Sequence, residues 1–266
     1  MSADTLQFLI WLAHEAGDAI MQVYRSDFAV QQKGDHSPLT EADLAAHRII
    51  RDGLKRLSPE LPLISEECEL APFTERQQWQ RYWLVDPLDG TREFVKRNDE
   101  FTVNIALIDH GKAVLGVVYA PALGICYYGD EHGAYKQQDN AAPQGIHARP
   151  LNLEQITVAC SRSHPGKKIQ AMLQNIGLKH GEPRVINMGS SLKICLVAAG
   201  EADLYPRLGL TSEWDTAAAQ CVLERAGGQL IDRHGLPLQY NRKDTILNPE
   251  FFACGATAHD WNQYLE

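Results

Sequence analysis

One stretch constrains the fold of this chain more than any other, namely residues 83–91 with the sequence WLVDPLDGT. A short apolar run typical of a strand stops there at two carboxylates, Asp86 and Asp89. Pro87 fixes one backbone torsion and removes a donor, while Gly90 allows a turn that residues with a Cβ resist. The two carboxylates can therefore converge on one point at the mouth of the strand.

Two interpretations of this turn remain open from the stretch alone. Converging carboxylates repel each other unless something positive lies between them. Hard divalent cations such as Mg²⁺ are held by one or two carboxylates, waters and substrate phosphate oxygens, which this turn can provide. A polar turn without a ligand explains the same residues, because Asp, Pro and Gly are ordinary turn residues.

Further acids occur in similar settings along the chain. The apolar run at residues 61–67 ends in a Glu-Glu pair that includes Glu66. Asp215 stands where a helix rich in small residues is expected to begin, and Asp43 stands near the start of another. Taken alone, each aspartate is explained by capping, Asp215 as an N-cap and Asp43 as the acid of a capping box opened by Thr40.

Taken together, these motifs resemble the lithium-sensitive, magnesium-dependent phosphatase superfamily that includes inositol monophosphatase. The family pattern is a Glu-Glu pair, then a W-x-x-D-P-x-D-G-T block, then a distant W-D before a small-residue helix, and all three occur here in order. The resemblance covers nearly the whole chain and is closest to the bacterial 3'(2'),5'-bisphosphate nucleotidases of the CysQ type. That closer likeness rests on residues 81–94, 101–108, 161–164, 189–193 and 204–207.

The resemblance implies an α/β fold, a layered α/β/α/β/α sandwich of the inositol monophosphatase and fructose-1,6-bisphosphatase type. An amino-terminal α+β half, residues 1–150, would carry most metal ligands. A carboxy-terminal α/β half, residues 151–266, would supply Asp215 and the substrate-binding residues. The polar residues 139–150 are the expected seam, and the two halves together would form one catalytic unit.

The resemblance also implies a metal centre that holds two or three Mg²⁺ ions. One ion would be bound by Glu66, Asp86 and the main-chain carbonyl of Leu88. A second would be bound by Asp86, Asp89 and Asp215. Inhibition by Li⁺ is a further property that the resemblance implies.

Roles in catalysis and substrate binding follow from the same resemblance. Thr91 paired with Asp43 would orient the attacking water, with help from Glu66. Lys193 and Arg207 would lie near a second, non-scissile phosphate, although a solvated surface position is the alternative for each. The full set of implied substrate contacts is Gly90, Thr91, His164, Ser190, Lys193, Arg207 and Asp215.

The implied reaction is hydrolysis of the 3'-phosphate of 3'-phosphoadenosine 5'-phosphate to AMP and phosphate, in sulfur assimilation and nucleotide recycling. 3'-Phosphoadenylyl sulfate is a further candidate substrate. An inositol or sugar monophosphate phosphatase is the alternative within the enzyme class, because it would share every metal ligand. A catalytically silent metal-binding protein is disfavoured, because Thr91, Asp43 and all the acids are present.

Composition narrows the partners. The net charge of -9 argues against binding to a nucleic-acid polymer, which depends on clustered Lys and Arg. Asp4 stands where a secretory leader would be basic, and no apolar run approaches the roughly 20 residues that span a bilayer. We therefore expect a cytoplasmic protein, and peripheral contact with the cytoplasmic face of the inner membrane stays open.

The six cysteines contain no C-x-x-C pair and are expected to be reduced and mostly buried.

Hydrophobic periodicity predicts an amphipathic helix over residues 6–24 and a second from about Glu41, with Leu44, Ile50, Leu54 and Leu57 facing inward. The polar residues 31–38 between them are expected to form a loop. A hairpin is predicted from residues 101–108 and 113–119, and it continues as a meander through residues 124–128 and 133–136. Beyond residue 153, strands and helices are expected to alternate at residues 156–160, 168–176, 185–188, 192–199 and 216–226.

Overall fold

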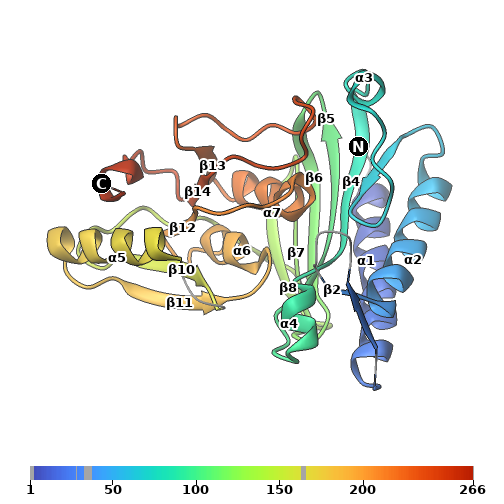
Figure 1. The fold of residues 1–266 in the computed structure, drawn as a ribbon, viewed down its shortest axis with the longest axis horizontal. Helices are drawn as coiled ribbons and strands as arrows, with labels where there is room; N and C mark the ends of the chain where they lie inside the picture. The colour runs from blue at the N-terminus through green and yellow to red at the C-terminus, as the bar shows by residue number, and fades with distance from the viewer. Residues whose placement is uncertain (1–2, 28, 33–37, 163–165, 266) are drawn as a thin grey trace.

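A computed structural model describes residues 3–27, 29–32, 38–162 and 166–265 of the 266-residue chain. Two β-sheets and the helices around them form five alternating layers (Figure 1). The predicted α/β/α/β/α sandwich is therefore confirmed.

The larger sheet has seven strands in the order β3-β4-β5-β6-β7-β8-β9. Strand β3 is parallel to β4, and every other neighbouring pair is antiparallel, so the predicted hairpin and meander are confirmed. The strands are β3 (Leu63–Ser65), β4 (Arg81–Asp89), β5 (Thr102–Asp109), β6 (Lys112–Ala120), β7 (Ile125–Asp130), β8 (Gly133–Gln138) and β9 (Gln144–Gly145).

The smaller sheet has five strands in the order β11-β10-β12-β14-β13. Strand β10 is parallel to both of its neighbours, and β14 is antiparallel to both of its own. The strands are β10 (Thr157–Ser161), β11 (Arg184–Met188), β12 (Leu204–Arg207), β13 (Gln229–Asp232) and β14 (Phe251–Cys254).

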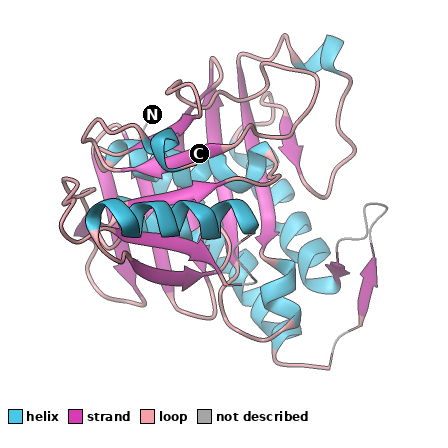
Figure 2. Ribbon diagram, turned by 60° about the vertical axis from the view of Figure 1, so that its left-hand side comes forward, coloured by secondary structure: helices cyan, strands magenta, loops and turns pink. Residues whose placement is uncertain are grey.

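Three helical layers cover the sheets. Helices α1 (Ala3–Tyr24) and α2 (Glu41–Leu57) pack on one face of the larger sheet, and α6 (Leu192–Ala198) and α7 (Glu213–Arg225) lie between the two sheets. Helix α5 (Lys167–His180) lies across the outer face of the smaller sheet together with the 3-10 helix η1 (Trp261–Tyr264), as a second view shows (Figure 2). The remaining elements are the short helices α3 (Phe73–Arg76) and α4 (Thr91–Val95) and the paired strands β1 (Val30–Gln32) and β2 (Pro38–Thr40).

Strand β4 is buried on both faces, and the alternation of its side chains explains why. Trp83 and Val85 join the core beneath α1 and α2. Tyr82 and Leu84 point the other way, into the core that the sheet shares with α6 and α7. The strand that carries the acidic turn is thus held from both sides, which fixes the point where its last residues emerge.

Two local expectations were wrong. Leu44 is 39 % exposed, because small residues, Ala42 and Ala46, occupy the inner face of α2 beside Ile50. The expected loop at residues 31–38 is partly strand, since β1 pairs with β2 through Gln32 and Pro38. Residues 33–37 of that segment lie outside the described residues.

The cysteines are as the sequence predicts. All six are free, and only Cys68 is not fully buried. In the part of the chain that the structure describes, no helix is long and apolar enough to cross a membrane.

Candidate active site

The acidic turn is built by an irregularity at the end of β4. In a regular strand, residues three apart point to opposite faces. Here the pairs Asp86 with Asn104 and Asp89 with Thr102 place three steps of β4 against two of β5, which is a β-bulge. The bulge brings both carboxylates to one side. The Leu88 N–H donates to Asp86 Oδ1 at 3.0 Å. The Asp86 side chain therefore also stabilises a polar turn, which was the alternative to metal binding.

The structure brings three predicted metal ligands together. One carboxylate oxygen from each of Asp86, Asp89 and Asp215 lies within 4.8 Å of the others. Asp215 comes from the first turn of α7, but it is not the N-cap that the sequence suggested. Ser212 is the N-cap, and its N–H donates to Asp215 Oδ2 at 2.9 Å, which makes Asp215 the acid of a capping box. Glu66 directly follows β3, beside the end of β4, and its N–H donates to Val85 at 3.3 Å.

The electrostatics of this acidic group favour a bound cation. Asp86 is buried, and Asp89 and Asp215 are partly exposed. Removal from water, and then the neighbouring carboxylates including Glu66, raise the pKa of Asp86 well above its usual value. Burial raises the pKa of Asp89 to about 6 and that of Asp215 to about 8, against an ordinary value of 3.8. Because the donors are all oxygens and repel each other when ionised, they fit a hard divalent cation.

Thr91 and Asp43 form a second part of the site. Thr91 Oγ1 donates to Asp43 Oδ1 at 3.3 Å and lies 3.4 Å from the Leu88 carbonyl oxygen. The other oxygen of Asp43 accepts the N–H of Thr40 at 2.8 Å and its hydroxyl at 2.7 Å. The capping interpretation of Asp43 is therefore confirmed, and its second oxygen contacts Thr91.

Gly90 joins the acidic turn to α4, which begins at Thr91. Its φ of +91° lies in the left-handed region that favours glycine. A Cβ there would also lie 3.2 Å from the Glu100 carbonyl oxygen. A substitution at Gly90 would therefore displace the hydroxyl of Thr91.

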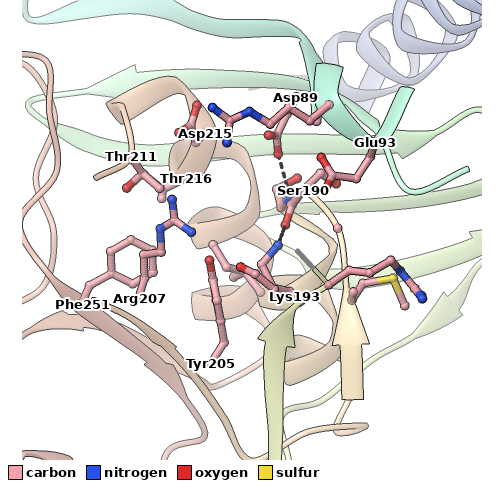
Figure 3. Close-up of a pocket in the computed structure, with 18 residues that line it drawn as sticks. Asp89, Glu93, Ser190, Lys193, Tyr205, Arg207, Thr211, Asp215, Thr216 and Phe251 are labelled. Atoms are coloured by element: carbon pink, nitrogen blue, oxygen red, sulfur yellow. Dashed lines mark hydrogen bonds between the residues drawn. The ribbon is translucent and has the colours of Figure 1, made fainter. Parts of the chain in front are cut away.

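The acids open into a cavity of about 230 Å³ between the two sheets. Figure 3 shows Asp89 and Asp215 on one side of this cavity and the cationic ends of Lys193 and Arg207 on the other. The Lys193 ammonium donates to the Ser190 carbonyl at 2.5 Å, and burial lowers its pKa to about 8 although Asp89 opposes the shift. Lys193 is buried and Arg207 is half-buried in the cavity wall.

The predicted base contact, His164, lies outside the described residues. All other predicted site residues lie in or next to the acidic group and the cavity.

Sequence reasoning missed a polar layer beneath Asp89. The Ser191 N–H donates to Asp89 Oδ2 at 2.6 Å, and the Ser191 hydroxyl donates to Asn104 Oδ1 at 2.9 Å. Asn104 also approaches Asp89, at 3.5 Å. Asn104 could have been found from the sequence, because it is a single amide side chain within the mostly apolar sequence of β5.

An ion pair between the buried Glu100 and the half-exposed Arg162 was also missed at the edge of the cavity. Glu100 accepts the Arg162 Nε–H at 2.7 Å and the Gly189 N–H at 2.8 Å. It thereby holds the turn that presents Ser190, whose φ of +45° is unusual for a residue with a side chain.

Comparisons with known proteins agree with this geometry. The model of the inositol monophosphatase family matches residues 2–263. The fold and the oxygen-donor site thus define the class, and the chain belongs to the inositol monophosphatase family.

Within that family the chain groups with the CysQ-type nucleotidases. It is 50% identical over 242 residues to the 3'(2'),5'-bisphosphate nucleotidase CysQ of Escherichia coli K12, covering 90% of this chain and 95% of the relative. The crystal structure of CysQ from Bacteroides thetaiotaomicron matches with a TM-score of 0.83 and 35% identity, covering 96% of this chain and 98% of that one. An IMPase from Thermotoga maritima matches with a TM-score of 0.80 and 26% identity over 98% of both chains.

Proposed function

We propose that this protein removes the 3'-phosphate of 3'-phosphoadenosine 5'-phosphate, giving AMP and phosphate, and that 3'-phosphoadenylyl sulfate is a second substrate. The observation that carries the proposal is one cavity with Asp89 and Asp215 on one wall and Lys193 and Arg207 on the other, and Arg92, Glu93 and Arg162 also line it. A substrate with two phosphate groups fits such a cavity, because one group can meet the metal centre and the other the cations. The similarity to nucleotidases at 50% identity supports the same assignment.

The metal centre would hold two or three Mg²⁺ ions. Glu66, Asp86 and the Leu88 carbonyl would bind one, and Asp86, Asp89 and Asp215 the other. Bound Mg²⁺ would offset the negative charge that develops on the attacking and leaving oxygens. Inhibition by Li⁺ stays a prediction, as does the cytoplasmic location.

Residues 1–150 and 151–266 would act as two halves of one catalytic unit. The larger sheet ends with β9 at Gly145, and the smaller sheet starts with β10 at Thr157. Support for a shared site comes from Asp215 of the second half, which lies beside Asp86 and Asp89 of the first.

Thr91 would orient the attacking water. Because its hydroxyl donates to Asp43, its oxygen lone pairs are free to accept a proton from water, and Asp43 can take up the proton that Thr91 gives. The water oxygen would bond to phosphorus as its proton passes to Thr91 and on to Asp43. The bond to the 3'-oxygen would break with its electron pair left on that oxygen, which would take a proton from solvent water to become the 3'-hydroxyl of AMP. Release of the proton held by Asp43 to solvent would balance the step. The N–H groups of Gly90 and Thr91 would face the phosphate at the start of α4.

Lys193, Arg207 and Ser190 would bind the 5'-phosphate, and His164 would lie near the base. Two positive groups favour a dianionic phosphate through charge-assisted hydrogen bonds. An inositol monophosphate has no second phosphate to fill this part of the cavity, which argues for the bisphosphate.

Phosphate release with and without Mg²⁺ tests the proposal directly. We expect 3'-phosphoadenosine 5'-phosphate to be hydrolysed with a higher kcat/KM than inositol 1-phosphate or fructose 1,6-bisphosphate, and none of the three to be hydrolysed in EDTA. A preference for inositol 1-phosphate would contradict the nucleotidase assignment and leave only the metal-dependent phosphatase chemistry.

Substitution of the two cations tests how the substrate binds. Lys193→Met and Arg207→Met are each expected to lower kcat/KM for the bisphosphate about tenfold to a hundredfold. A hydrogen bond to a charged group contributes about 1.5–3 kcal/mol, and each tenfold change in kcat/KM corresponds to about 1.36 kcal/mol. Hydrolysis of a simple monophosphate should change much less. Lys136→Met is the control, because Lys136 pairs with Glu201 away from the cavity. Equal losses on both substrates would show that the cations support the fold or the metal centre instead.

A further inference from the structure

Glu213 is a buried acid with no part in the proposed contacts to metal or substrate. It opens α7 two residues before Asp215, and its side chain has 0% exposure. Its Oε2 accepts the Asn241 N–H at 2.7 Å, and its Oε1 accepts the Lys243 ammonium at 2.9 Å. Lys243 keeps 38% exposure, so a fully buried carboxylate is paired with a half-exposed cation.

Such a pair is weak evidence for stability, because desolvation of the carboxylate offsets much of the attraction. An apolar side chain of similar volume would fill the same space without that cost. The position of Glu213 therefore points to a geometric role.

The segment that Glu213 contacts, residues 241–248, encloses the start of α7. The Glu213 N–H donates to the Ile246 carbonyl at 2.9 Å. The Asn248 side chain donates to the Ser212 carbonyl at 2.7 Å. Ser212 is also the residue whose N–H holds the carboxylate of Asp215 at 2.9 Å. The backbone that orients Asp215 is thus fixed by this segment.

The same segment is tied to the amino-terminal half by Arg76 of α3. Arg76 is 1% exposed and donates to Asn241 Oδ1 at 2.5 Å and to the Lys243 carbonyl at 3.2 Å. In return the Asn241 amide donates to the Arg76 carbonyl at 2.5 Å. Helix α3 lies in the connection between β3, which Glu66 directly follows, and β4, which carries Asp86 and Asp89 near its other end. These contacts therefore join the segment around the start of α7 to the connection that leads from Glu66 to β4.

We propose that Glu213 is a positioning residue that sets Asp215 at the distance from Asp86 and Asp89 that a shared cation requires. The inference rests on the proposed metal centre and adds a residue that acts through another. Without the Glu213 carboxylate, the start of α7 loses its link to Asn241 and Lys243, and the carboxylate of Asp215 is held less closely.

Direct Mg²⁺ binding, measured by isothermal titration calorimetry and by the shift in Tm on adding Mg²⁺, tests this role. Glu213→Ala is expected to weaken Mg²⁺ binding about tenfold or more, the range found when residues that orient metal ligands are removed. The double variant Glu213→Gln with Lys243→Met keeps an oxygen for the Asn241 N–H and leaves no ammonium unpaired. It should recover binding to within about threefold of the unmodified protein, by the same comparison.

Asp203→Asn is the matched control. Asp203 is also a buried acid, and it accepts the Thr157 N–H at 2.6 Å and the Arg149 Nε–H at 2.8 Å, from two residues that lie outside α7. We expect it to lower the Tm of the metal-free protein and to leave Mg²⁺ affinity unchanged. Should Glu213→Ala fail to fold, Lys243→Met alone should still weaken Mg²⁺ binding several-fold.

Three results would overturn the inference. Mg²⁺ binding by Glu213→Ala, or by Lys243→Met where the alanine variant does not fold, could equal that of the unmodified protein. Asp203→Asn could weaken binding as much as the Glu213 variant does. Absence of Mg²⁺ binding in the unmodified protein would instead overturn the metal centre itself, and with it this inference.

Discussion

Asp89→Asn is expected to lower kcat by about a thousandfold or more, or ~4 kcal/mol at about 1.36 kcal/mol per decade. The amide removes one negative charge from the group that would bind the second Mg²⁺, and it cannot replace the carboxylate as a strong ligand. Phosphate release at saturating Mg²⁺ measures the effect, and circular dichroism checks that the fold is kept. Activity near that of the unmodified protein would contradict the metal assignment.

The same variant should change how the stability of the metal-free protein depends on pH. An ordinary Asp loses its proton near pH 3.8, whereas Asp89 and Asp215 in the folded protein do so near 6 and 8. Between these values the folded state holds more protons than the unfolded state, so the free energy of unfolding falls as pH rises. In EDTA, Tm should therefore fall from pH 5 to pH 8, and it should fall less in Asp89→Asn. A Tm that does not respond to pH would contradict the raised pKa values that burial gives these acids.

Thr91→Val is expected to lower kcat by about a hundredfold to ten-thousandfold, the usual contribution of positioned proton transfer. Valine keeps the shape of the side chain but removes the hydroxyl that lies 3.3 Å from Asp43. Because the residue stands at the edge of the metal centre and is not one of the proposed side-chain ligands, Mg²⁺ affinity should change little. Rapid-quench or steady-state assays with titrated Mg²⁺ separate the two effects.

Thr91→Ser is the control for this substitution, since it retains the hydroxyl. It should keep most of the activity, with a small loss from the added freedom of the side chain. If serine and valine were equally damaging, the hydroxyl would not be the feature that matters.

The acidic motifs could be assigned from the sequence because each lies at the boundary of a strongly patterned element. The apolar run before Asp86 predicts a strand, and Pro87 and Gly90 predict its end. The sequence alone did not predict the bulge that turns Asp86 and Asp89 to one side, because a bulge depends on the register with β5. That Asp215 lies beside Asp86 and Asp89 was predicted only from the family resemblance. The hydrophobic pattern of a sequence does not specify how two halves of a chain pack together.

The capping interpretations show a second limit. Capping and function were expected to be alternatives for Asp43 and Asp215, and the expectation that Asp215 is itself an N-cap was wrong, since Ser212 has that position. Both aspartates are instead the third-residue acids of capping boxes, and both also lie beside the acidic group. A carboxylate has two oxygens with several lone pairs, so one can accept a backbone N–H while the other faces the site. Contacts such as Arg76 with Asn241 were beyond pattern analysis, because 165 residues separate the partners.

The placement of Asp215 across from Asp86 and Asp89 bears on the lifetime of the protein as well as on its chemistry. A ligand that binds only the folded state stabilises it by about 2.7 kcal/mol at a hundred times its Kd. A cation shared by acids from both halves is such a ligand, and it opposes the separation of the two sheets that exposes the chain to proteases. The concentration of Mg²⁺ around the protein would then govern how fast the polypeptide itself is lost to proteolysis.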